Sequence, residues 1–147
     1  MIHNKISDLD YSVQKKFKEA LDFMNSSEKL KEHGVEKVVI SESLRDLPTQ
    51  MAYYARGRME PQDVKRYYAA AGLYDIGDAE ARQIVTKTLN SNHMSGKACD
   101  FVPVKDGKTW WSAPAEVWEI MGIIGEECGL KWGGRWKDLP DSPHFEA

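Results

Sequence analysis

Two histidines and two aspartates in the second half of the chain are of the residue types that form hydrolytic metal sites. The stretch "SNHMSGKACDF" places His93 seven residues before Asp100, and "DSPHFE" places Asp141 three residues before His144. A hydrolytic zinc site needs three imidazole or carboxylate ligands, one open position for water and a nearby carboxylate that takes the proton of that water. His93, Asp100 and His144 are therefore candidate ligands, and Asp141 is the carboxylate next to the third of them.

Each of these residues also has an ordinary structural interpretation. A loop histidine bonded to backbone would explain His93, and a buried acid capping a turn would explain Asp100. Asp141 stands beside two prolines, which is typical of a turn. Two histidines and one aspartate taken from 147 residues are a weak signal by themselves. The other two histidines, His3 and His33, lie in polar sequence and make poor ligands.

Length and charge limit the classes of protein to which the chain can belong. With 147 residues and 41% hydrophobic content, we expect one domain spanning residues 1–147. The 20 basic and 23 acidic residues form no long block of one sign, so no nucleic-acid partner is expected. No window approaches a membrane span and the N-terminus has no apolar signal segment, so we expect a cytoplasmic protein. We also expect a monomer. Cys99 and Cys128 have no CxxC spacing and are expected to be free thiols.

The first half of the chain predicts mainly helices. Apolar residues recur at helical spacing from about Tyr11 to Asn25, and "EKVVIS" (36–41) favours a strand. The stretches "LPTQMAYYARG" and "EPQDVKRYYAAAG" each have a proline near the start and a glycine at the end, which predicts two short helices.

The second half predicts strands, one further helix and an irregular tail. We expect strands over 82–88 and 97–104, then a turn at "KDGK", with "TWWS" as a further segment that pairs after this turn. A helix follows, with Ser112 as its cap and Gly129 as its stop. The tail should be a loop followed by a short terminal strand. These elements predict an α+β fold, with helices packed on a small, mainly antiparallel sheet.

Two long motifs resemble those of the zinc peptidases that cut peptidoglycan peptides. "SNHMSGKACDF" resembles their SxHxxGxAxD motif, and "GLKWGGRWKDLPDSPHFE" resembles their GLxWGGxW…DxPHFE motif. Upstream, "SLRDLPTQMAYYARGR" is similar to their YRSxxxQxxLYxxGR segment, with Arg45, Gln50, Gly57 and Arg58 in register. This family contains D-alanyl-D-alanine carboxypeptidases and L-alanyl-D-glutamate endopeptidases, and its resemblance implies the hedgehog/DD-peptidase fold.

The resemblance also implies roles for individual residues. It implies that His93, Asp100 and His144 bind Zn²⁺ and that Asp141 is the catalytic base. Arg45 matches the substrate-binding arginine of the family, and a guanidinium suits a substrate peptide that carries carboxylates.

Two further residues are expected to contact substrate or support the ligands. These are Gln50 and Ser91. The chain departs from the family pattern at Ser43 and Leu44, where a Gly-Tyr pair is usual, and in a long link over 59–83. We expect this link to form a helix beside the site and to alter the substrate subsites.

The resemblance leaves the scissile bond open. Members without a signal peptide resemble phage endolysins that cut the L-alanyl-D-glutamate bond and wait in the cytoplasm for holin-dependent release. This predicts a bacteriolytic phage or prophage hydrolase acting on the peptidoglycan of the cell wall. The alternatives are a D-alanyl-D-alanine carboxypeptidase and a non-catalytic zinc-containing wall-binding module. An acid at Asp141 argues against the binding module, which needs no base.

Overall fold

Five antiparallel strands form a single sheet in the computed structural model, which describes residues 2–147. The strand order is β1-β2-β5-β4, and β3 pairs with β2. Their bounds are β1 Lys37–Glu42, β2 Ala98–Lys105, β3 Lys108–Thr109, β4 Lys131–Trp132 and β5 His144–Glu146. The predicted α+β class, with a small antiparallel sheet and packed helices, is confirmed.

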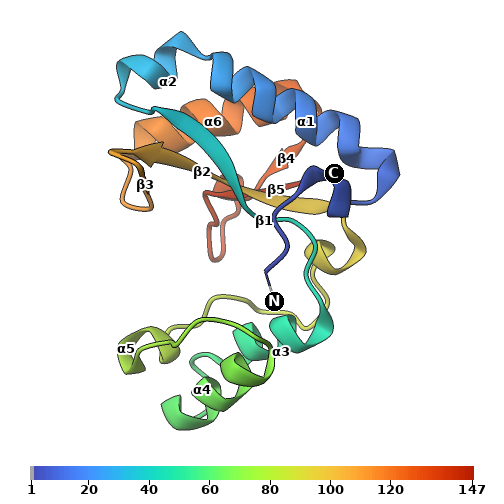
Figure 1. Cartoon of the computed structure of the whole chain (residues 1–147), viewed down its shortest axis with the longest axis vertical. Coiled ribbons are helices and arrows are strands. Elements are labelled where there is room, and N and C mark those ends of the chain that lie inside the picture. The colour runs from blue at the N-terminus through green and yellow to red at the C-terminus, as the bar shows by residue number, and fades with distance from the viewer. Residues whose placement is uncertain (1) are drawn as a thin grey trace.

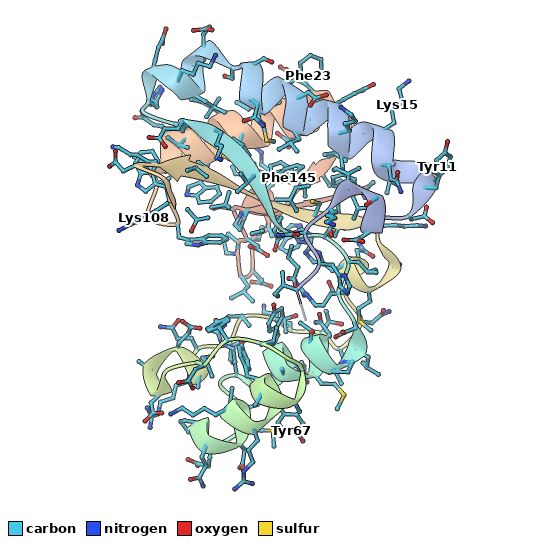
Figure 2. All side chains as sticks on the ribbon, in the orientation of Figure 1. Tyr11, Lys15, Phe23, Tyr67, Lys108 and Phe145 are labelled. Carbon is cyan, nitrogen blue, oxygen red and sulfur yellow. The ribbon has the colours of Figure 1, made fainter. Side chains whose placement is uncertain are left out.

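One face of the sheet is covered by helices from both ends of the chain. These are α1 (Tyr11–Ser26), α2 (Glu28–Glu32) and α6 (Ala115–Glu127), which Figure 1 shows on the far side of the sheet from the other helices. Their buried apolar side chains form one core with the sheet, and Figure 2 labels Phe145 within it. We call this unit the sheet lobe.

No helix in residues 2–147 is long and apolar enough to cross a bilayer.

A second group of helices lies beyond the other face of the sheet (Figure 1). It consists of α3 (Leu47–Ala55), α4 (Pro61–Ala70) and α5 (Asp78–Ala81). This helical lobe has a small core of its own, formed by Ala52, Ala55, Val64, Tyr68, Ala71, Ile76 and Ala81. Its farther end carries the exposed Tyr67, labelled in Figure 2. The predicted helix in the 59–83 link is therefore present as α4.

The alternation of side chains along the strands decides what faces the helical lobe. Successive residues of a strand point to opposite faces of the sheet. Cys99, Phe101 and Phe145 are fully buried in the core of the sheet lobe. Asp100 and His144, which are neighbours of these residues in sequence, therefore point to the opposite face. The strand pairing also places these two directly opposite each other, on β2 and β5.

The predicted strand over 82–88 is wrong. This segment has no strand pairing, and Ile84 and Val85 remain exposed. Threonine hydroxyls supply local hydrogen bonds instead: Thr86 Oγ1 accepts from the backbone of Thr88, while Thr88 Oγ1 accepts from that of Asn90. Such side chains compete with a strand ladder for the backbone donors, and here the local bonds prevail.

The predicted cap of α6 is also wrong. Pro114 occupies the N-cap position, and no side chain caps the helix there. Ser112 lies two residues too early, in a turn closed by the bond from the Ala113 backbone nitrogen to the Trp110 carbonyl oxygen. The predicted end of the helix is confirmed, because Gly129 adopts a φ of 87° directly after the C-cap.

Candidate metal centre

Three side chains from separate segments converge on one point of the open sheet face. His93 comes from the short 3-10 helix Asn92–Ser95, Asp100 from β2 and His144 from β5. His93 Nε2 lies 3.1 Å from Asp100 Oδ1 and 3.1 Å from His144 Nδ1. His144 Nδ1 lies 3.3 Å from Asp100 Oδ1. The structure thus brings together the three residues that the sequence singled out as ligands.

These distances fit a small cation with tetrahedral coordination. Donor atoms about 2.0 to 2.1 Å from a zinc ion lie about 3.3 Å apart along the edges of a tetrahedron. The three donor atoms of the site form a triangle of this size. Two imidazole nitrogens and one carboxylate oxygen are also a donor set that zinc accepts. This group of residues could therefore hold a metal.

Hydrogen bonds to the opposite ring nitrogens orient both histidines. His93 Nδ1 lies 2.8 Å from the Ser43 carbonyl oxygen, to which it donates, so Nε2 keeps its lone pair for a cation. His144 Nε2 lies 2.7 Å from Glu146 Oε1, and the same argument leaves Nδ1 free to act as a ligand. Glu146 in turn accepts from Asn92 Nδ2 at 2.7 Å. Ligand histidines are commonly fixed by a carboxylate or carbonyl in this way.

The charged groups of the site influence one another's ionisation. Burial opposes ionisation of Asp100, but the imidazoles of His93 and His144 hold its pKa below the usual range. Burial would also lower the pKa of His144, but its bonds to Asp100 and Glu146 raise it to about 9. The cluster therefore favours positive charge at its centre, which a metal ion would supply in place of a proton.

Asp141 lies at the edge of this cluster, in the loop before β5. Its Oδ2 is 4.0 Å from His144 Nδ1, and 42% of its side chain is exposed. Partial burial and the nearby carboxylate of Asp100 raise the pKa of Asp141 to about 6. A cation at the three donors would oppose this rise. The carboxylate is thus close to the centre and accessible to water, as a general base must be.

Arg45 lies beside the cluster but is already held by protein groups. Its Nε donates to Glu42 Oε1 at 3.1 Å, and its Nη1 donates to Gln50 Oε1 at 2.8 Å. Its guanidinium also lies 4.6 Å from the ring centre of Tyr53, whose hydroxyl donates to Glu42 Oε2. The charge of Arg45 is therefore balanced within the protein, although the side chain lines the cleft.

The two other predicted substrate residues occupy different environments. Gln50 is fully buried, and its amide nitrogen donates to the Thr88 carbonyl oxygen at 2.7 Å. Together with its bond to Arg45, this ties α3 to the 82–90 segment. Ser91 lines the cleft and caps the short helix that carries His93, because its Oγ accepts from the His93 backbone nitrogen. Their predicted contacts with substrate remain predictions.

Sequence reasoning did not single out two acids of the site. Glu42 lies opposite Asp100 in the β1–β2 pairing and binds Arg45. Glu146 binds His144, and its position two residues later on the same strand puts it on the same face. The two-residue spacing between His144 and Glu146 could have identified Glu146 from the sequence. Glu42 could not be identified in this way, because its position beside the centre depends on the register between β1 and β2.

An open cleft of about 1020 Å³ contains the centre and extends to the helical lobe. One wall carries the centre and the 136–141 loop, including the exposed Trp136. The other wall is formed by residues of α3 to α5 and by the 83–88 segment. The centre therefore lies in a cleft that is lined by residues of both lobes.

Comparison with known sequences identifies relatives of this C-terminal region. Residues 85–147 match the family described as "D-alanyl-D-alanine carboxypeptidase". The L-alanyl-D-glutamate peptidase of Listeria phage A118 is 33% identical over 63 residues, which are 42% of this chain. The matched segment covers 22% of that relative, so the chain spans only about a fifth of its length.

Comparison with solved structures extends over nearly the whole chain. The Serratia marcescens L-Ala D-Glu endopeptidase ChiX matches with a TM-score of 0.57 and 22% identity, covering 96% of this chain and 81% of ChiX. The D,D-pentapeptidase VanY, solved as an E175A mutant with Zn(II), matches with a TM-score of 0.51 and 13% identity. That match covers 94% of this chain and 71% of VanY. These matches confirm the fold.

Proposed function

We propose that the chain hydrolyses peptidoglycan stem peptides, because residues 85–147, which hold all the candidate ligands and Asp141, match the family described as "D-alanyl-D-alanine carboxypeptidase" and resemble a phage L-alanyl-D-glutamate peptidase. The observation that carries this proposal is the triangle of donor atoms on the open sheet face, with a water-accessible carboxylate beside it. A module that only bound the wall would not need that carboxylate.

Zinc is the cation that we propose for the centre. The donor set of two imidazoles and one carboxylate leaves the fourth tetrahedral position open, as in catalytic zinc sites. VanY, which shares the fold, was solved with Zn(II).

The residues of the chain divide the work of hydrolysis between them. When bound, the metal polarises the scissile carbonyl and makes a water molecule acidic enough to react near neutral pH. Asp141 accepts the proton of the attacking water and returns it to the leaving amine. Ser43 and Glu146 hold the two imidazoles in the tautomers that bind the metal. Arg45 lines the cleft in a position fixed by Glu42 and Gln50, and contact between it and the substrate is part of this proposal.

The L-alanyl-D-glutamate bond is the proposed site of cleavage. The phage relative and ChiX both carry that specificity in their names. The cleft is also lined by residues of the helical lobe, so it offers room for substrate beyond the centre itself. The second candidate is D-alanyl-D-alanine carboxypeptidase activity, which the description of the matched family favours.

Mass spectrometry of peptides released from purified peptidoglycan distinguishes the two candidates. New N-terminal D-glutamate is expected from the endopeptidase, whereas free D-alanine as the sole product would establish the carboxypeptidase. No release of either product by the zinc-loaded protein would contradict both.

The biological role that we propose is that of a phage or prophage endolysin. The phage origin of one relative supports it. On this proposal the monomeric protein collects in the cytoplasm and reaches the wall after holin-dependent release. Induced expression with and without a holin tests the proposal: lysis should require the holin, and lysis at the same time without it would contradict this route.

A further inference from the structure

Arg56, at the C-terminal end of α3, is a buried cation that forms no ion pair within residues 2–147. Only 8% of the residue is exposed. Its Nε donates to the Glu80 backbone carbonyl oxygen at 3.1 Å, and its Nη1 donates to the Tyr68 hydroxyl at 3.4 Å. Within residues 2–147, no carboxylate oxygen lies within 4 Å of its guanidinium nitrogens. A buried charge without a counterion is costly, so its position calls for an anionic partner.

The free edge of this guanidinium is available to the cleft. Arg56 is one of the residues lining the cleft. Its Nη2 has no hydrogen-bond partner within the described chain, yet it is not among the fully enclosed unsatisfied atoms, which are Ser43 Oγ and Thr49 Oγ1. Arg56 thus differs from Arg45, whose guanidinium is bound on both sides by Glu42 and Gln50.

A carboxylate of opposite charge lines the same part of the cleft. Glu80 Oε1 accepts a hydrogen bond from the Tyr74 hydroxyl, whereas Oε2 has no partner among the described residues. The rings of Tyr68 and Tyr74 lie edge to face, with centroids 5.4 Å apart, and connect the two charged groups. The free Nη2 of Arg56 and the free Oε2 of Glu80 therefore lie in the same part of the cleft, beside Tyr68 and Tyr74. We call this part the corner.

This corner lies away from the metal centre, along the helical-lobe wall. The guanidinium of Arg45 lies over the Tyr53 ring, and that ring lies 6.0 Å from the ring of Tyr68, which binds Arg56. These contacts connect Arg45, beside the centre, with the corner through the rings of Tyr53 and Tyr68. The centre and the corner line the same cleft, so a substrate held at the centre can place a neighbouring residue at the corner.

We propose that Arg56 and Glu80 form a subsite for a free amino-acid head group, with its carboxylate on Arg56 and its ammonium on Glu80. This inference rests on the proposed function. In a stem peptide, such a head group is the side-chain end of a diaminodicarboxylic acid at the third position. Lysine at that position offers only the ammonium. The subsite therefore selects peptides with a diaminodicarboxylic acid.

The first test changes the substrate and leaves the protein intact. Three tetrapeptides, L-Ala-γ-D-Glu-X-D-Ala, carry meso-diaminopimelate, its amide at the free carboxyl group, or L-lysine as X. Loss of one charge-assisted hydrogen bond weakens binding by about 10- to 100-fold. For the amide peptide and the lysine peptide, kcat/KM should therefore fall by that factor, mainly through a higher KM. Equal kcat/KM for all three peptides would overturn the subsite.

The second test assigns the preference to the two residues. Arg56→Gln should reduce kcat/KM for the meso-diaminopimelate peptide by a larger factor than kcat/KM for its amide, so that the preference between the two peptides is lost. Glu80→Gln should lower kcat/KM for both the meso-diaminopimelate peptide and its amide, because both peptides carry the ammonium group. Arg66→Gln, at an exposed arginine of α4, is the matched control. Thermal unfolding identifies variants that fail to fold, in which case the comparison of the three peptides on the unmodified protein decides.

Binding separates this inference from the proposed activity. The same peptides can be titrated into the zinc-loaded Asp141→Asn protein, which is not expected to turn them over. Tighter binding of the meso-diaminopimelate peptide would support the subsite even if no bond were cleaved by the parent protein. Equal affinities would reject the subsite even if the L-alanyl-D-glutamate bond were cleaved.

Discussion

At the scale of single residues, the metal centre is defined by which nitrogen of each histidine is left free. His93 uses Nε2 because Nδ1 is occupied by the Ser43 carbonyl oxygen, whereas His144 uses Nδ1 because Nε2 is occupied by Glu146. Without these partners, each ring could rotate or protonate on its ligand atom. The ligand geometry therefore depends on residues that never touch the metal.

Removal of either histidine should remove most of the bound metal. We expect His93→Ala and His144→Ala each to reduce zinc content to well below one ion per chain, because two donors remain. Glu146→Gln should keep the ligands but weaken zinc affinity by about 10-fold or more. Elemental analysis and competition with a chelator measure these effects. Full zinc occupancy in both alanine variants would refute the ligand assignment.

Substitution of Asp141 should separate chemistry from metal binding. Asp141→Asn has nearly the same shape but cannot accept a proton, so hydrolysis should fall by about 100-fold or more. Zinc content and the unfolding temperature should stay at parent values, since Asp141 Oδ2 lies 4.0 Å from the ligand nitrogen and is not itself a ligand in the triangle. Parental rates of peptidoglycan hydrolysis in this variant would assign the base to another acid.

At the scale of elements, the loop before β5 delivers both His144 and Asp141. The Asp141 backbone nitrogen donates to the Gly133 carbonyl oxygen at 3.0 Å, and Trp132 Nε1 donates to the Ser142 carbonyl oxygen at 2.7 Å. The loop therefore packs closely against the segment after β4. Little space is left between them at Gly133, where a Cβ atom would lie 2.6 Å from the Asp141 carbonyl oxygen.

Adding a methyl group at Gly133 should displace this loop. Gly133→Ala would also place the new Cβ 3.0 Å from the Cβ of His144, so we expect weaker zinc binding and a loss of stability of about 1 to 3 kcal/mol. Gly77→Ala is the matched control, because its Cβ meets nothing within 4 Å. Chelator competition and denaturant unfolding measure the two effects. Zinc affinity that is equal in the two variants would show that the loop adapts without moving His144.

Most elements of the fold could be predicted from the sequence because local patterns determine them. The helical spacing of apolar residues predicted α1, and the apolar run over 97–104 predicted β2. The motif around His144 indicated the terminal strand. The 82–88 segment could not be predicted, since its threonine side chains replace the ladder bonds. Arg56 and Glu80 meet through the packing of α3 against the α4–α5 region, which no spacing in the sequence encodes.

At the scale of the whole molecule, two lobes with separate apolar cores enclose the cleft. The core of the sheet lobe and that of the helical lobe share no buried residue. The metal ligands belong to the sheet lobe and to the segment leading into it, whereas Arg56 belongs to the helical lobe. Metal binding and recognition of the distal substrate should therefore depend on different parts of the molecule.

Matched truncations in the two cores test this division. Val64 in α4 and Val117 in α6 are both fully buried, and each Val→Ala change should cost about 2 kcal/mol in its own lobe. With Val64→Ala, hydrogen exchange should accelerate in α3 and α4 while β2 and zinc affinity stay unchanged, and KM for the peptide should rise. With Val117→Ala, exchange should accelerate in α6 and the sheet. Equal acceleration in both lobes for each variant would show that the two cores unfold as one unit, because the Gln50 and Arg45 contacts would then couple them fully.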